Sequence, residues 1–180
     1  MSVTSRELPA PWRAFLADVD RALIQPVEIH CLGGFVAAFY YDLPRPTNDL
    51  DYVEVVPHEA TAMLQQLAGQ GSALAAKHRL HFQHVGVASL PDSYAERLVA
   101  LADGVFRRLQ LSALDPHDLA LSKLVRNSPI DREDVAQLAR GVPLDSALLR
   151  ARYELELRPI LIGDQERTDR TLRLWIEAYF

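Results

Sequence analysis

The protein has 180 residues, of which 49% are apolar and 24% charged, the composition of an ordinary globular protein with enough chain for a full hydrophobic core. Its formal net charge of −5 excludes a strong overall attraction to nucleic acid, but not a local basic patch. The single cysteine, Cys31, excludes an internal disulfide, and no apolar run is long enough to cross a bilayer. The start of the chain lacks the pattern of a signal peptide, so we expect a cytoplasmic protein without membrane contact.

The first part of the chain alternates helical and strand patterns. Apolar residues at helical spacing predict a helix from Pro11 to Leu23. A partly β-branched run predicts a strand from Val27 to Leu32, which ends at Gly33 and Gly34. A short helix and then a loop with several prolines are expected to follow, because proline prevents regular helix.

The second strand is predicted over Leu50 to Val56. Its alternation places Tyr52 and Glu54 on one face and Val53 and Val55 on the other. The next predicted elements are a helix from Pro57 to about Gly69, a strand within 78–90, a short helix or turn within 91–101, and a strand within 105–114.

From Asp115 onward the pattern is helical. Asp115 is placed to cap a helix that begins at Pro116, and further helices are predicted over 144–157 and 164–179. Strands mixed with helices, followed by helices alone, predict an α/β (α+β) fold. We expect a mixed sheet flanked by helices over residues 1–112, with a helical C-terminal region over 113–180 packed on it.

Two aspartates mark the start of the second strand. Asp49 and Asp51 are separated by one residue, so they point to the same side of an extended strand. Carboxylates this close repel each other, and a cation between them relieves the repulsion. Magnesium prefers oxygen ligands, so the pair is a candidate Mg²⁺ site. The alternative is that one acid caps a turn and the other faces water.

Two glycines and two loop residues lie near this pair in the sequence. Gly33 and Gly34 stand between a strand and a helix, where missing side chains let a phosphate approach backbone N–H groups. A plain tight turn is the alternative. Arg45 could pair with phosphate oxygens and Thr47 could donate its hydroxyl, although a loop arginine is usually only solvated.

The stretch "LGGFVAAFYYDLPRPTNDLDYVEV" resembles the nucleotidyltransferase superfamily, which has the fold of DNA polymerase β. The signature of that superfamily is a hydrophobic residue before Gly33 and Gly34, a helix, and then Asp49 and Asp51 at the start of the next strand. The pattern Arg-x-Thr-x-Asp-x-Asp is similar to the branch that includes AbiEii-type toxins and related bacterial proteins.

A later stretch of this sequence, "LDPHDLALSKLVRNSPIDREDVAQL", resembles a second signature of that branch. The resemblance implies that Lys123 places its charge on a phosphate and that Asp131 orients the lysine or joins the site, with Asp134 as a further member. From the residues alone, the favoured interpretation is that Lys123 is an exposed helix residue and Asp131 a helix N-cap.

The resemblance implies a magnesium-dependent nucleotidyltransferase. Asp49 and Asp51 would hold Mg²⁺, and Gly33 and Gly34 would hold the triphosphate of an NTP substrate. A nucleoside monophosphate would pass to a hydroxyl of RNA (tRNA among the candidates), of a protein or of a small molecule. The branch also implies the toxin of a toxin–antitoxin pair, with an antitoxin as partner.

The sequence departs from the family in one respect. Many members carry a third carboxylate on a later strand, but residues 78–90 contain no acid, and His81 and His84 occur there instead. Imidazole is a poor magnesium ligand, so we expect these histidines on a sheet face. An alternative function is therefore a catalytically degenerate protein of this fold that binds a nucleotide or a protein partner. A third is an antitoxin-like or scaffold protein that uses the C-terminal helices.

Two features remain outside these signatures. Arg97, Arg107 and Arg108 are mixed with acids, which predicts a solvated face, although the last two could contact an RNA backbone. The terminal "WIEAYF" predicts a helix that docks on the domain, with a dimer contact as the alternative.

Overall fold

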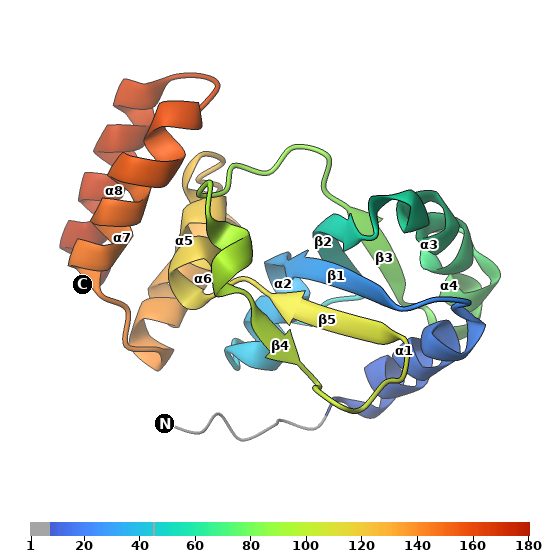
Figure 1. Ribbon diagram of the computed structural model, residues 1–180. Helices are drawn as coiled ribbons and strands as arrows, with labels where there is room; N and C mark the ends of the chain where they lie inside the picture. Colours follow the sequence, from blue (N-terminus) through green and yellow to red (C-terminus); the bar gives the residue numbers. More distant parts are fainter. Residues whose placement is uncertain (1–7, 45) are drawn as a thin grey trace. The chain divides into compact units, whose positions relative to one another are not determined.

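The computed structural model describes residues 8–44 and 46–180, which group into two compact units. Within these residues, the first unit comprises 8–40, 44, 46–86 and 99–113, and the second comprises 41–43, 87–98 and 114–180. The first unit is a mixed sheet with helices, and the second is built of helices (Figure 1). The predicted combination of a mixed α/β core and a helical C-terminal part is confirmed.

The described residues of the first unit form a five-stranded sheet with the order β3-β2-β1-β5-β4. Its strands are β1 (Val27–Leu32), β2 (Asp49–Val56), β3 (His81–His84), β4 (Val99–Leu101) and β5 (Leu109–Ala113). β1 is antiparallel to β2 and parallel to β5, β3 is parallel to β2, and β4 is antiparallel to β5. The short edge strand β4 was not predicted.

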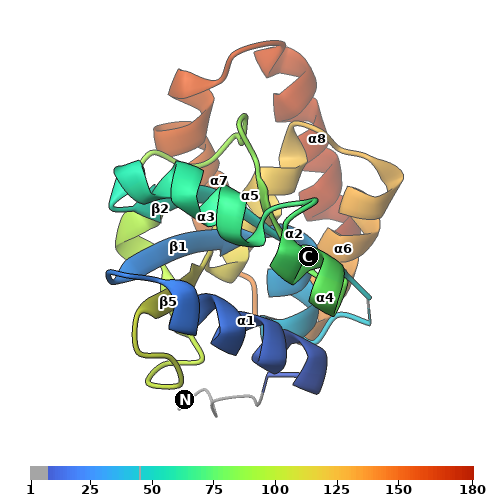
Figure 2. The ribbon, with the colours of Figure 1, turned by 90° about the vertical axis from the view of Figure 1, so that its right-hand side faces the viewer.

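One face of this sheet is covered by α1 (Ala10–Ala22), α3 (Thr61–Ala68) and α4 (Ala73–His78), which Figures 1 and 2 show on the same side. The 3₁₀ turn η2 (His58–Ala60) precedes α3. The covered face carries the apolar core of the unit; among its fully buried side chains are Phe15, Leu16, Ile29, Cys31, Leu50, Tyr52 and Leu64. Burial raises the pKa of the Cys31 thiol, which therefore acts as a small core residue.

The alternation predicted for β2 is wrong because the strand contains a bulge. The register between β1 and β2 shifts so that Tyr52 and Glu54 oppose successive residues of β1, which leaves Val53 as an extra residue. Tyr52 is 0% and Val55 1% exposed, and both face the core. Glu54 consequently lies on the opposite face, the one that also carries the polar residues of β1.

The second unit consists of helices and helical turns (Figure 1). These are η3 (Tyr94–Arg97), α5 (Pro116–Leu124), α6 (Pro129–Gly141), α7 (Ser146–Arg152), η4 (Tyr153–Leu157), η5 (Arg158–Ile160) and α8 (Gln165–Tyr179). The predicted cap is confirmed, since the Asp118 N–H donates to the Asp115 carboxylate at 2.8 Å and Pro116 is the first helical residue. Trp175 of α8 is buried and its Nε1–H donates to the side chain of Asn127, so the terminal helix docks within this unit.

The expectation that Arg97 is solvated is wrong. Its guanidinium donates to both carboxylate oxygens of Asp118, at 2.9 and 3.2 Å, and to both of Glu156, at 3.2 and 2.8 Å. Asp118 is 0% exposed, and burial is the main reason why its pKa is raised. A buried carboxylate needs a partner of this kind, so Arg97 fixes η3 to α5 and η4.

None of the helices in the described part of the chain combines the length and apolar character that a membrane span requires.

Candidate functional site

Asp49 and Asp51 lie at the start of β2, on the sheet face opposite α1, α3 and α4. Their neighbours in register are His81 and Gln83 on β3, and Asp51 also opposes Leu32 at the end of β1. Both aspartates are partly exposed, while Leu50 between them is buried on the other face. The two carboxylates therefore share an accessible face, as their spacing predicts.

Gly33 is in contact with one of these carboxylates. Its φ of +73° lies in the left-handed region, and a Cβ built on it would be 2.2 Å from Oδ2 of Asp51 and 3.0 Å from the Asp51 Cβ. Only glycine meets both conditions. Gly33 begins α2 (Gly33–Phe35), in which Gly34 is buried, and the helix continues as the π-helical η1 (Val36–Tyr40). The glycine pair thus brings the first helical turn and Asp51 together.

Thr47 holds Asp49. Its hydroxyl donates to the carboxylate of Asp49 and, at 3.1 Å, to the backbone oxygen of the same residue. The hydrogen bond to the carboxylate fixes the side chain of Asp49 at the start of β2. Arg45, the other predicted nucleotide-binding residue of the loop, lies outside the described residues.

The remaining predicted site residues belong to the second unit, where they contact one another. Lys123 of α5 is 4% exposed, and its Nζ lies 2.8 Å from Oδ2 of Asp134 and 3.8 Å from Oδ1 of Asp131. Asp131 also completes a capping box with Ser128 at the start of α6 and is bound through both oxygens by Arg126. The prediction from the residues alone that Lys123 is exposed on its helix is therefore wrong. The N-cap of α6 is Ser128, and not Asp131 as predicted from the residues alone.

The strand beside β2 carries no acid. On β3, His81 and Gln83 lie on the face of Asp49 and Asp51, opposite those two residues in register. His84 lies on the other face, with its ring centroid 5.2 Å from that of Tyr52. Both histidines are on sheet faces as expected, but only His81 shares the face of the aspartate pair.

Three polar residues of this face were not among the predicted site residues. Glu28 and His30 of β1 alternate with buried apolar residues, and Ser112 of β5 opposes His30 in register. The Ser112 hydroxyl donates to Glu28 Oε1 at 2.6 Å, and that oxygen lies 3.9 Å from Nε2 of His30. The signal was present in the sequence, since "VEIHCL" places polar side chains on one face of a strand whose other residues are apolar.

Comparison with known protein families identifies the family of this chain. Residues 22–177 match the model of DUF6036, a family described as nucleotidyltransferase of unknown function. The chain belongs to this nucleotidyltransferase family. The match covers both units and confirms the resemblance to the nucleotidyltransferase superfamily, whereas the AbiEii-type branch stays a prediction. No curated protein and no solved structure matches the chain.

Nucleotidyltransferases generally use a divalent metal and an NTP, and the donor set of the aspartate pair fits such a metal. Among residues 8–44 and 46–180, no three His, Cys, Asp or Glu side chains converge so as to hold an ion by themselves. Mg²⁺ is commonly bound by one or two carboxylates together with water and substrate phosphates. Asp49 and Asp51 therefore suit an ion that binds together with a triphosphate, rather than one in an all-protein cage.

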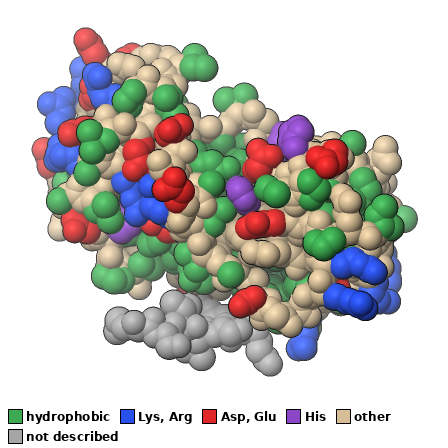
Figure 3. Space-filling view, viewed as in Figure 1, with side chains coloured by type: hydrophobic (Ala, Val, Ile, Leu, Met, Phe, Trp, Pro, Cys, Tyr) green, Lys and Arg blue, Asp and Glu red, His purple; other side chains and the backbone are tan. Residues whose placement is uncertain are grey.

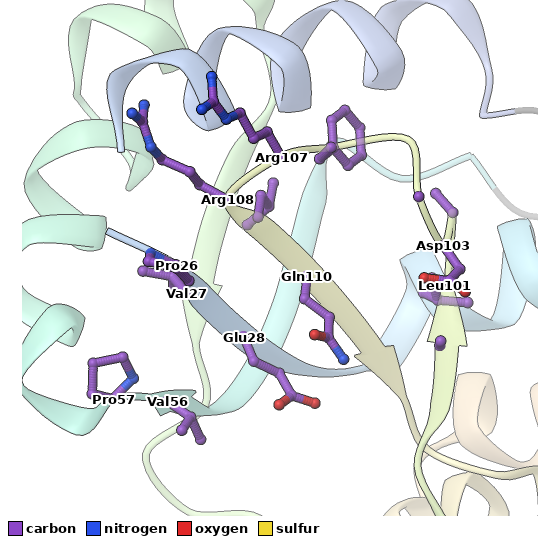
Figure 4. A pocket seen from close by; sticks show the side chains of 15 residues that line it. Pro26, Val27, Glu28, Val56, Pro57, Leu101, Asp103, Arg107, Arg108 and Gln110 are labelled. Atoms are coloured by element: carbon purple, nitrogen blue, oxygen red, sulfur yellow. The ribbon is translucent and has the colours of Figure 1, made fainter. Parts of the chain in front are cut away.

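The same sheet face contains a cavity of about 490 Å³ at its far end from Gly33. Figure 4 shows Glu28, Val56 and Gln110 projecting from three neighbouring strands at its wall, with Pro26 and Pro57 at one side. On the face seen in Figure 3, acidic and histidine side chains gather over these strands. The cavity has the size of a small-molecule site.

Acid will weaken the contribution of Asp131 to stability. Burial, the largest influence, acts to raise its pKa, but hydrogen bonds from Arg126 and Ser128 outweigh burial and lower the pKa from 3.8 to about 2. A carboxyl with a lowered folded-state pKa stabilises the protein above the unfolded-state pKa, and this contribution is lost as the pH falls from about 4 to about 2. We expect Asp131→Asn to lower the urea midpoint at neutral pH, and the difference from wild type to shrink below about pH 4. A difference that stays constant down to pH 2 would contradict this.

Proposed function

We propose that this nucleotidyltransferase moves a nucleoside monophosphate from an NTP to a hydroxyl group, with Mg²⁺ held by Asp49 and Asp51. The observation that carries the proposal is the contact between Gly33 and Asp51, because it joins the glycine turn and the acidic strand end in one site. The half-exposed carboxylates and the family membership support the same function.

The proposed roles follow from the chemistry of each group. Gly33 and Gly34 have no Cβ, so the phosphates of a triphosphate could approach their backbone N–H groups closely. Thr47 keeps Asp49 in place, and Arg45 would pair with phosphate oxygens. We retain a phosphate-binding role for Lys123 with Asp131 and Asp134 as a proposal, in addition to the buried ion pair that the lysine forms.

At the α-phosphorus the reaction forms one bond and breaks one, and the acceptor hydroxyl releases its proton to water. The acceptor oxygen bonds to the α-phosphorus of the NTP, the bond from that phosphorus to the bridging oxygen breaks, and pyrophosphate leaves. A divalent ion supplies charge stabilisation for the phosphates when bound. The acceptor proposed is a hydroxyl of tRNA or another RNA, of a protein or of a small molecule. By the branch resemblance, the protein would act in the cytoplasm as the toxin of a toxin–antitoxin pair.

Transfer should vanish when the metal-binding pair is broken. We expect Asp49→Asn to reduce incorporation of α-labelled NTP by at least about 100-fold, because one of two charged oxygen donors is lost. The assay supplies each NTP in turn, with Mg²⁺ and with total tRNA, the protein itself or a mixture of small polyhydroxyl compounds as acceptor. Asp92→Asn, which removes the same charge from an exposed position of the second unit, is the matched control and should transfer at the wild-type rate.

A degenerate nucleotidyltransferase is the second candidate, favoured because His81 and Gln83, and no third carboxylate, lie beside the aspartates on β3. It predicts that Mg²⁺-ATP raises the melting temperature of the wild type, through Asp49, without any label transfer. Transfer by the wild type that is unchanged in Asp49→Asn would refute the proposed site altogether.

A further inference from the structure

The cavity that Glu28 lines, called the Glu28 cavity below, combines a polar floor with apolar sides. Its volume of about 490 Å³ is within the range of small-molecule sites, and all of its lining residues belong to the first unit. Glu28 of β1 and Gln110 of β5 project from the sheet into the same space (Figure 4). The apolar part of the wall includes Pro26, Val56, Pro57, Leu101 and Phe106.

Glu28 is held in place and yet remains accessible. The hydroxyl of Ser112, a residue that is 3% exposed, donates to Glu28 Oε1 at 2.6 Å, whereas the Glu28 side chain is 32% exposed. A carboxylate whose position is fixed before binding loses little conformational freedom when a ligand arrives. Glu28 is therefore a preorganised acceptor for a positively charged donor.

The basic residues of the wall do not oppose this charge. Arg107 and Arg108 line the cavity, but Figure 4 shows both side chains turned away from Glu28. Arg108 donates to the backbone oxygen of Leu23, at the end of α1, at 2.9 Å. Asp103, in the loop that follows β4, adds a second acid to the wall. A positively charged ligand is therefore favoured over a negatively charged one.

Two other cavities have different linings. A cavity of about 540 Å³ beside α3 and β3 contains no carboxylate, and its polar side chains are Gln65, Gln66, Gln70, His81, Gln83 and His84. A cavity of about 370 Å³ in the second unit contains three arginines and two acids. Among these three, the Glu28 cavity is the one whose charges suit a cation.

An accessible row of side chains on β2 connects the Glu28 cavity with the aspartate pair. In the register of β1 and β2, Val56 is opposite Glu28, and Asp51 is opposite the residue four positions further along β1. At about 3.3 Å per residue, the cavity lies about 13 Å from Asp51 along the strands. Val56 is 46% exposed and the Glu54 side chain, between Val56 and Asp51, is 40% exposed. A molecule in the cavity can therefore extend along β2 toward the phosphates.

We infer that the Glu28 cavity binds a small organic cation that carries hydroxyl groups, with its charged nitrogen against Glu28, and that this molecule is the acceptor in the transfer reaction. The second part of this inference rests on the proposed function. Gln110 both donates to and accepts from hydroxyl groups, and the apolar wall packs against the carbon skeleton. A hydroxyl oxygen at the other end of the molecule bonds to the α-phosphorus, its proton is released to water, and pyrophosphate leaves. The distance of about 13 Å requires a molecule longer than one sugar ring.

Calorimetric titration without NTP tests the binding site. The probes are glucosamine and its linear dimer and trimer, with glucose, cellobiose and cellotriose as uncharged counterparts of the same length, at about pH 6.5, where such amines are protonated. We expect the amino dimer and trimer to bind at least about 10-fold more tightly than their counterparts, because a charge-assisted hydrogen bond is formed. Glu28→Gln, which retains an acceptor for Ser112, should abolish this preference.

Matched variants separate the cavity from general charge and from unfolding. Glu177→Gln makes the same change at an exposed position of the second unit and should bind the probes as the wild type does. Ala100→Trp, at an exposed lining position, should fill the Glu28 cavity and weaken binding at least about 10-fold, with a melting temperature close to that of the wild type. Gln66→Trp fills the cavity beside α3 instead and should leave binding unchanged.

Transfer of label from α-labelled NTP to the same probes, with Mg²⁺ present, tests the acceptor role. The wild type should label the amino dimer and trimer, and Glu28→Gln should raise the KM for them at least about 10-fold while the KM for the NTP is unchanged. Absence of a preference for the charged probes, or a preference that persists in Glu28→Gln, overturns the inference and leaves the proposed function standing. Label that passes to tRNA or protein, while bound amino sugars stay unlabelled, overturns the acceptor role alone. Glu28-dependent binding without transfer to any acceptor supports the cation site and overturns the proposed function.

Discussion

Gly33→Ala should destabilise the protein by about 2–5 kcal/mol and abolish transfer. Alanine at a φ of +73° costs about 1–2 kcal/mol from backbone strain alone. The new methyl group would also lie 2.2 Å from Asp51 Oδ2 and 3.0 Å from its Cβ. Rotation of the carboxylate relieves only the first of these contacts, so the backbone must also shift, which adds about 1–3 kcal/mol.

The chain offers a matched control for the strain. Gly71 has a φ of +86° in the turn between α3 and α4, and a Cβ there would meet nothing within 4 Å. Gly71→Ala should therefore show the strain alone, with full transfer activity, in urea unfolding at a constant m-value. If Gly33→Ala and Gly71→Ala cost the same and both transfer normally, Gly33 and Asp51 are not in the contact described.

Lys123→Met should be the most destabilising of the proposed substitutions. It leaves Asp134, which is 5% exposed, without the ammonium 2.8 Å away, and it removes a nearby positive charge from Asp131, which is 0% exposed. Loss of one member of a buried ion pair costs about 3–5 kcal/mol. The measurement is the free energy of unfolding from urea titration at neutral pH.

The double variant Lys123→Met/Asp134→Leu separates stability from function. Replacement of both charges by apolar groups of similar size is often neutral, so most of the lost stability should return. Transfer should nevertheless stay low, because the ammonium assigned to a phosphate is absent. A double variant that is stable and also active would show that Lys123 serves packing alone, and one that stays unstable would show that the pair itself is not the source of the loss.

The elements that were predicted correctly are those whose residues carry their own local signal. Asp115 and Pro116 start a helix in almost any context, and the apolar run from Val27 ends at glycines whose freedom the turn requires. Asp49 and Asp51 share a face simply because they are two residues apart in a strand. For such features the surrounding structure adds little to what the local chain dictates.

The features that were missed depend on partners distant in the sequence. The bulge at Val53 arises from pairing with β1, and the partners of Arg97 lie 21 and 59 residues further along the chain. The hydrogen bond from Ser112 to Glu28 likewise forms only because the fold pairs β5 with β1. Composition and periodicity do not show which distant residues a side chain will contact in the folded chain.

The path of the chain has a consequence for how this protein can be divided. The helical unit includes 87–98, which lies between β3 and β4 of the other unit, and Arg97 within that stretch neutralises the buried Asp118. A gene fragment that encodes only 114–180 would retain Arg152, 3.0 Å from Asp118, but lose Arg97, which binds both oxygens of this buried carboxylate. Recombination of gene segments that moves 114–180 alone would therefore leave behind a stretch, 87–98, that belongs to the helical unit and strengthens the pairing of its buried carboxylate.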